Sequence, residues 1–218
     1  MKYKILTILG TRPEIIRLSC IIRSLDKNFD HKIVNTNQNF SNTLNKNFFK
    51  DLKITKPFYS MKNEKKNSPI IFIAKSLIFF DEILAKEKPD AVIILGDTNS
   101  SLTSICAKRK KIPIFHLEAG NRCFDQRVPE EINRKIVDHL SDINLTYSSY
   151  AENNLINEGL KRDFVIKVGS PLYEVYNYYK SDIDKSKILN QLKIETNNYI
   201  LASIHREENV DDMNNLEN

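Results

Sequence analysis

Cysteine is scarce in this sequence, and its spacing excludes the structures that need several cysteines together. Only Cys20, Cys106 and Cys123 occur among the 218 residues, they lie far apart, and no C-x-x-C pair is present. An odd and widely spaced set argues against a disulfide framework or a zinc site and favours a reducing compartment. We therefore predict a cytoplasmic protein that holds no metal.

Long hydrophobic runs are lacking as well. The N-terminal segment MKYKILTILGTRPE has one apolar run, which ends at Gly10 and is too short to span a membrane. The segment also has no signal-peptide cleavage site. We predict that this run forms the first β-strand and that the protein has no membrane partner.

Strong charge of one sign is absent. Lysines and arginines number 33 against 28 aspartates and glutamates, which leaves a net charge of +5, and the basic residues are spread along the chain. Because no basic block with interleaved aromatic residues occurs, we predict no nucleic-acid partner. The glycine-rich nucleotide signals G-x-G-x-x-G and G-x-x-x-x-G-K are also missing. A pocket for an anionic small molecule suits this charge at least as well.

Apolar segments of strand length alternate with longer segments of helical period. The strand candidates are nearly continuous in apolar residues, as expected for parallel strands covered on both faces. They comprise residues 3–9, 32–36, 91–95, 113–118, 143–148 and 164–169. Helical stripes are formed by Ile15, Leu18, Ile22 and Leu25, and by Ile132, Ile136, Val137 and Leu140. The alternation predicts an α/β protein with a doubly wound parallel sheet, in which ligands bind at the carboxyl ends of the strands.

The composition changes after Gly169-Ser170-Pro171. Residues 172–194 are rich in lysine and tyrosine and show a helical pattern, and residues 199–209 are expected to start a new strand. We predict a first domain at 1–170, followed at 171–218 by linker helices and the start of a second domain. Since one isolated strand cannot form a domain, we expect the second domain to be truncated or to continue elsewhere.

The motif LGTRPE follows the first predicted strand. Gly10 permits a tight turn from strand to helix, and Thr11 can cap the helix that Pro13 would begin. Helix N-termini attract anions, and Arg12 adds a forked phosphate donor. From these residues alone, a phosphate site and a plain capped helix explain the motif equally well.

Carboxylates end two further predicted strands. Asp97, in ILGDTNSS, is either a helix N-cap or a carboxylate at the ligand edge of the sheet. Glu118, in HLEAG, is a poor cap, and a glutamate near a buried strand end needs a partner or a raised pKa. His116 in the same motif suits a packed strand histidine better than a catalyst.

The segment VPEEINRKIVDH combines a helix start with several charges. Glu130 and Arg134 stand four residues apart, as do Glu131 and Lys135, which is typical of surface ion pairs. Glu130 and Arg134 also flank the apolar stripe, so they could instead point into a cleft. His205, at the end of the last predicted strand, is a natural proton carrier near neutral pH.

Together these motifs resemble the bacterial non-hydrolysing UDP-N-acetylglucosamine 2-epimerase family. The matching segments are Gly10–Glu14, Gly96–Thr98, His116–Gly120, Pro129–Arg134, Asn154–Leu155, Glu158–Gly159, His205–Arg206 and Glu208–Asn209. They keep the family's order and spacing through nearly all 218 residues, which correspond to the first half or somewhat more of a typical member. The resemblance implies the first half of a glycosyltransferase-B-type fold, in which two Rossmann-like domains enclose the active site.

The resemblance also implies a reaction. Members invert C2 of a UDP-2-acetamido sugar without a nicotinamide or metal cofactor, by removal of the C2 proton, departure of UDP from C1 and its return to a glycal-like intermediate. We accordingly expect a UDP-sugar substrate, no cofactor, a homodimer, and a role in precursor synthesis for bacterial surface polysaccharides such as lipopolysaccharide or capsule.

Site residues carry over from the same resemblance by position. Acid–base candidates are Asp97, Glu118 and Glu130, with His205 reaching in from the second domain. Substrate-binding candidates are Arg12 for the diphosphate, Arg134 to organise the carboxylates, and Arg17, where the family usually has lysine.

Several departures from the family pattern define the alternatives. Gln38-Asn39 replaces a common Gln-His, Ile204 a usual glycine, and Glu207 a usual arginine. Residues 120–134 look closer to the branch that forms UDP-N-acetyl-L-fucosamine than to the N-acetylglucosamine branch. Because the family's C-terminal half grips most of the nucleotide, a catalytically inactive N-terminal fragment is one alternative, and a hydrolysing 2-epimerase is another.

Overall fold

A seven-stranded parallel sheet organises the chain. The computed structural model describes residues 2–38, 48–62 and 68–202. The strands lie in the order β3-β2-β1-β4-β5-β6-β7, and every neighbouring pair is parallel. They are β1 (Lys4–Leu9), β2 (Asp30–Asn35), β3 (Tyr59–Ser60), β4 (Ala91–Leu95), β5 (Ile114–Ala119), β6 (Ile143–Thr146) and β7 (Val165–Lys167). The order runs outward in both directions from β1 and β4, so these two strands form the switch point where such sheets bind ligands.

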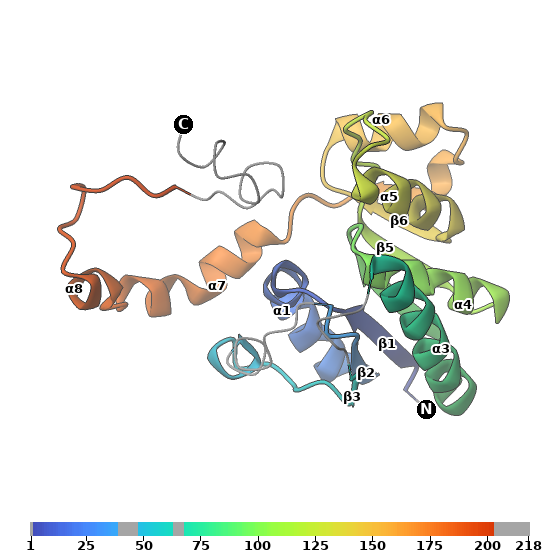
Figure 1. Ribbon diagram of the computed structural model, residues 1–218, viewed down its shortest axis with the longest axis horizontal. Helices are drawn as coiled ribbons and strands as arrows, with labels where there is room; N and C mark the ends of the chain where they lie inside the picture. Colours follow the sequence, from blue (N-terminus) through green and yellow to red (C-terminus); the bar gives the residue numbers. More distant parts are fainter. Residues whose placement is uncertain (1, 39–47, 63–67, 203–218) are drawn as a thin grey trace. The chain divides into compact units, whose positions relative to one another are not determined.

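Helices connect the strands and cover the sheet (Figure 1). They are α1 (Arg12–Asn28), α3 (Pro69–Glu87), α4 (Ser104–Arg109), α5 (Pro129–Leu140) and α6 (Ser149–Asn157), with short 3-10 turns η1 (Asn99–Thr103) and η2 (Arg162–Phe164). Helices α7 (Leu172–Asp184) and α8 (Ile188–Leu192) follow the last strand. The doubly wound parallel sheet predicted from the alternation of elements is therefore confirmed.

Two separate apolar cores show that both faces of the sheet are covered. On one face, Leu6, Ile8 and Val92 of the strands pack with Phe80 and Leu84 of α3. On the other face, strand residues meet α1, whose predicted stripe is buried throughout. Ile15, Leu18 and Ile22 are 0% exposed and Leu25 is 8% exposed. Burial on both faces explains why these strands read as continuous apolar runs.

The six strands predicted within residues 3–169 all occur, and the short edge strand β3 adds a seventh that the sequence did not reveal. Residues 199–202 are not strand, and the rest of the strand expected at 199–209 lies outside the described residues. None of the helices in the described part of the chain is long and apolar enough to cross a membrane.

Helix α5 turns a different face inward from the one its apolar stripe suggested. Ile132 is 51% exposed and Ile136 is 37% exposed, whereas Glu131 and Asp138 are fully buried and Asn133 is nearly so. Polar side chains bury at low cost only where each finds hydrogen-bond partners. Those partners come from β5 and from the loops that follow β4 and β5, so their positions depend on the tertiary fold.

The chain divides into two units, Met1–Tyr178 and Tyr179–Asn218. In the first unit, the guanidinium of Arg23 in α1 lies 4.5 Å from the ring centre of Tyr178, a cation–π contact. The described part of the second unit contains the end of α7, helix α8 and an extended segment to residue 202. The domain boundary predicted at residue 170 stays a prediction.

Candidate active site

The strand ends at the switch point carry the polar motifs. Gly10 follows β1, and a Cβ added there would lie 2.3 Å from the hydroxyl oxygens of both Ser100 and Thr36. The Gly10 turn therefore requires glycine because neighbouring polar groups approach its backbone closely. Gly96, at φ +71°, makes the corresponding turn after β4 and leads into Asp97.

A carboxylate from the chain itself occupies the N-terminus of α1. Glu14 Oε2 accepts hydrogen bonds from the backbone nitrogens of Gly10 (2.8 Å) and Thr11 (2.6 Å), and Oε1 accepts from Thr98 Oγ1 (2.9 Å). Complete burial raises the pKa of Glu14, although these hydrogen bonds act in the opposite direction. Amides that could have bound a phosphate are thus already paired. The sequence signal for this arrangement is the Thr11-x-x-Glu14 spacing of a capping box.

Arg12 lies in the first turn of α1 with an exposed side chain. Among the described residues, it has neither an ion-pair nor a hydrogen-bond partner. Since Glu14 takes the amides of Gly10 and Thr11 just before this turn, Arg12 is the residue here that offers a charged group to an anion.

Glu118 sits on an unusual backbone at the end of β5. Its φ is +67°, a left-handed conformation that few residues other than glycine adopt, and the pairing with β6 shifts register between Leu117 and Ala119. The bulge brings its carboxylate beside the Gly96 turn and into an ion pair with Arg17 Nη1. Burial raises the pKa of Glu118; the charge of Asp97 acts in the same direction and that of Arg17 against it.

Arg134 links α5 to the segment that follows β4 by hydrogen bonds. Its Nε and Nη2 atoms donate to Asp97 Oδ2 at 3.0 and 2.6 Å, and Nη1 donates to Glu131 Oε2 at 2.9 Å. Asn133 Nδ2 donates to the backbone oxygen of Asp97 at 2.9 Å. Asp97 is therefore held from two directions by consecutive residues of one helix.

The two adjacent glutamates of α5 have different surroundings. Glu130 is exposed on the first turn and, in the part of the chain that the structure describes, is not paired with Arg134. Glu131 is fully buried and accepts from the backbone nitrogens of Cys123 (3.1 Å) and Phe124 (3.3 Å). Although burial opposes it, these hydrogen bonds lower the pKa of Glu131. Glu131 thus orders the loop before α5, a role that sequence reasoning did not assign.

A second, deeper cluster supports the end of β5. His116 is 0% exposed, donates from Nε2 to the backbone oxygen of Gly96 at 2.9 Å, and places Nδ1 2.9 Å from Asp138 Oδ1. Arg122 then bridges Asp138 Oδ2 (2.7 Å) and Glu158 Oε1 (2.7 Å). His116 is the packed strand histidine that its position predicted, and it links the Gly96 turn to α5.

The structure brings some of the predicted site residues together. The pair Arg17–Glu118 and the pair Arg134–Asp97 meet where β4 and β5 end, close enough for the charge of Asp97 to act on Glu118. Arg12 and Glu130 are exposed and, among the described residues, form no ion pair or side-chain hydrogen bond with these pairs, while His205 lies outside that part of the chain. Within the described ranges, no group of three or more His, Cys, Asp or Glu side chains could hold a metal ion.

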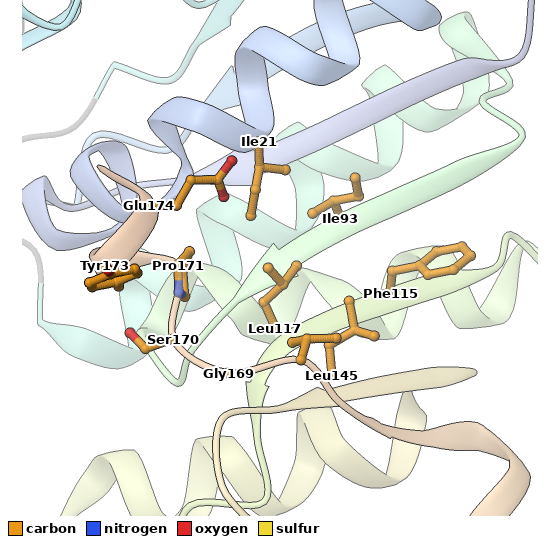
Figure 2. Close-up of a pocket in the computed structure, with 11 residues that line it drawn as sticks. Ile21, Ile93, Phe115, Leu117, Leu145, Gly169, Ser170, Pro171, Tyr173 and Glu174 are labelled. Carbon is orange, nitrogen blue, oxygen red and sulfur yellow. The ribbon is translucent and has the colours of Figure 1, made fainter. Parts of the chain in front are cut away.

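An apolar hollow of about 450 Å³ lies elsewhere in the first unit, between α1, the sheet and the segment after β7 (Figure 2). Ile21, Ile93, Leu117 and Leu145 line it, with Glu174 near its edge. None of the predicted site residues lines this hollow. Its side chains do not suit a charged nucleotide, so the strand-end carboxylates remain the candidate site.

Comparison with known proteins points to one family along most of the chain. The family model described as UDP-N-acetylglucosamine 2-epimerase matches residues 23–218. A UDP-N-acetylglucosamine 2-epimerase homolog from Methanococcus maripaludis is 40% identical over 218 residues, which are 99% of this chain and 60% of the relative. This chain therefore spans about 60% of the length of that curated relative.

Solved structures show the same likeness. UDP-N-acetylglucosamine 2-epimerase from Rickettsia bellii is 50% identical, with a TM-score of 0.84 over 89% of this chain and 52% of that one. The UDP-GlcNAc 2-epimerase from Methanocaldococcus jannaschii, solved in complex with UDP-GlcNAc and UDP, is 38% identical. Its TM-score is 0.88, and the match covers 98% of this chain and 60% of that one. The family predicted from the motifs is confirmed, and this chain belongs to the UDP-N-acetylglucosamine 2-epimerase family.

Proposed function

We propose that this chain supplies acid–base and leaving-group residues to a UDP-2-acetamido-sugar C2-epimerase of surface-polysaccharide precursor synthesis. The observation that carries the proposal is the meeting of the Asp97 and Glu118 carboxylates with the Arg17 and Arg134 guanidinium groups at the ligand edge of the sheet. Carboxylates there can move protons, and guanidinium groups can balance the charge of a departing diphosphate.

In the proposed reaction, a carboxylate accepts the proton from C2 and the C2–H electrons form a C1=C2 double bond. The C1–O bond breaks, and its electron pair leaves with UDP. A proton then returns to C2 from the opposite face while UDP re-forms the bond to C1, so atoms and charges balance and no redox partner is needed. Arg12 would hold the diphosphate in this scheme, and Glu130 and His205 would complete the acid–base set.

The environment of Glu118 suits it to proton transfer. A buried carboxylate with a raised pKa is a stronger base than an exposed one. The neighbouring Arg17 keeps the ionised form accessible. We therefore place Glu118 closest to the reacting carbon among the acid–base candidates.

The proposal is tested by incubating the chain with UDP-N-acetylglucosamine, or with the UDP-linked L-talo sugar of the fucosamine branch, in deuterated water. We expect deuterium at C2, detected by NMR, and a rate at least about 10²-fold lower for Glu118→Gln, which is nearly isosteric but cannot accept the proton. Glu152→Gln is the control, because Glu152 lies on α6 and pairs with the exposed Arg162.

Each alternative gives a distinct outcome in the same assay. Binding without exchange for either sugar would support a catalytically inactive portion. Release of free N-acetylmannosamine together with UDP would identify a hydrolysing enzyme. Unchanged exchange in Glu118→Gln would remove Glu118 from the mechanism.

A further inference from the structure

One polar group at the candidate site has no role in the scheme above. Tyr147 follows β6 directly, and its hydroxyl oxygen is buried without a hydrogen-bond partner in the described part of the chain. Almost all buried polar groups in folded proteins are paired, so an orphan of this kind calls for a reason.

The position of Tyr147 supplies that reason. Ala119 pairs with Thr146 across β5 and β6, so Tyr147 emerges beside the strand end that carries Glu118. Burial is the main cause that raises the pKa of Tyr147, the Glu118 carboxylate adds to it, and Arg17 opposes it. The phenol therefore stays protonated and presents an O–H donor close to the Arg17–Glu118 pair.

The neighbours of this donor indicate what it can bind. Diphosphate oxygens are better matched by the guanidinium groups of the site, because those groups carry charge. A neutral phenol suits a neutral acceptor instead. If Glu118 reacts at C2, the acetamido group bonded to that carbon through its nitrogen offers a neutral acceptor, its carbonyl oxygen.

We propose that Tyr147 is a specificity-determining residue that donates a hydrogen bond from its hydroxyl to the acetamido carbonyl of the bound sugar. The inference rests on the proposed function, because it places a 2-acetamido sugar against Glu118. It assigns to the orphaned hydroxyl a partner that arrives only with the substrate, and it makes that hydroxyl select 2-acetamido sugars over 2-hydroxy sugars.

The test compares Tyr147→Phe with the wild type in NMR binding titrations of UDP-N-acetylglucosamine and UDP-glucose, which carries a hydroxyl in place of the acetamido group. We expect the dissociation constant for UDP-N-acetylglucosamine to rise about tenfold in the variant, the usual effect of losing one hydrogen bond. The constant for UDP-glucose should not change. The melting temperature without ligand should rise, because the variant removes an unpaired buried hydroxyl.

Tyr150→Phe is the matched control, since Tyr150 lies three residues further on and is 86% exposed. It should alter neither affinity nor melting temperature. Equal affinity of wild type and Tyr147→Phe for UDP-N-acetylglucosamine, an equal loss for both sugars, or a lower melting temperature in Tyr147→Phe would each overturn the inference. A wild type that binds no UDP-2-acetamido sugar would instead refute the proposed function.

Discussion

At the scale of single residues, the candidate site depends on left-handed backbone at the strand ends. Gly96 and Gly120 adopt φ values of +71° and +79°, and Glu118 adopts +67° between them. A side chain in this conformation typically costs about 1 kcal/mol or more, so it persists only where the surroundings hold it. The ion pair with Arg17 stabilises Glu118 in this conformation, which explains how a glutamate occupies a position suited to glycine.

Gly120 offers a direct test of how tightly this region is packed. A Cβ there would lie 2.2 Å from the backbone oxygen of Ala151, an atom that cannot move without shifting α6. We expect Gly120→Ala to lower the free energy of unfolding by about 2–4 kcal/mol, combining the left-handed backbone with the clash. Urea unfolding followed by circular dichroism measures the loss.

Gly169→Ala separates the two causes. Gly169 has nearly the same φ, +80°, but a Cβ there would meet no atom within 4 Å. This variant should lose only about 1 kcal/mol, the conformational part alone. If both variants lose the same amount, the contact between Gly120 and α6 contributes nothing.

At the scale of elements, the buried carboxylate of Glu87 links four secondary-structure elements, which are α3, β1, β2 and β3. This network is distinct from the candidate site. Glu87 ends α3 and is 6% exposed. Its carboxylate pairs with Lys4 of β1 (3.3 Å) and Lys32 of β2 (2.8 Å), and it accepts from the hydroxyl of Tyr59 in β3. Burial alone would raise the pKa of Glu87, but hydrogen bonds from Lys32 and Tyr59 lower it to about 2.

This lowered pKa predicts acid sensitivity. The folded chain binds the Glu87 proton more weakly than the unfolded chain, so the stabilisation is complete above about pH 4.5 and disappears as the pH falls through about 2. Its size is on the order of 3 kcal/mol. Glu87→Gln should therefore be less stable at pH 7 and should lose less stability between pH 4.5 and pH 2 than the wild type, as measured by urea unfolding.

Glu82→Gln on the same helix is the control, because Glu82 is exposed. It should keep the wild-type stability and pH profile. Parallel acid profiles for wild type and Glu87→Gln would show that the network does not stabilise the fold.

Elements differ in how far the sequence determines them. The buried strands and the α1 stripe follow from apolar periodicity, because their partners are simply other apolar residues. The orientation of α5 does not follow from apolar periodicity, because its buried Glu131 and Asp138 need hydrogen-bond donors from residues outside the helix. The choice between Glu130 and Glu131 for burial is likewise set by helix phase, which two identical neighbouring residues cannot reveal.

The candidate site likewise has features that the sequence predicts and features that it does not. Position at a strand end made Asp97 and Glu118 candidates, because parallel strands deliver their carboxyl ends to one edge, and the family resemblance supplied their expected roles. Burial of Glu14 within the first turn of α1 and of the Tyr147 hydroxyl after β6 required knowledge of which groups surround them. Composition and periodicity carry no information about such surroundings.

At the scale of the whole molecule, the site exists only in the folded state. Arg17 and Glu118 are 101 residues apart in sequence, and Arg134 and Asp97 are 37 apart. A ligand of this site therefore binds the folded chain and not the unfolded one, and it must raise the melting temperature by mass action.

Under the proposed function, UDP-N-acetylglucosamine at about 100 times its dissociation constant should add about 2.7 kcal/mol of stability. For a chain of this size, that corresponds to a rise in melting temperature of roughly 5–10 °C. Arg12→Met should leave the ligand-free melting temperature unchanged, because Arg12 is exposed. If it weakens binding about tenfold, the shift at the same ligand concentration should fall to about half.

Arg109→Met is the control for lost positive charge, since Arg109 is exposed at the end of α4, just before the turn into β5. Its ligand-induced shift should match the wild type. Because both variants remove one charge, a reduction confined to Arg12→Met locates the diphosphate at the first turn of α1, beside the amides that Glu14 occupies. Equal reductions in both would mean that the shift reports net charge, and the diphosphate would then have to be held by Arg17 or Arg134.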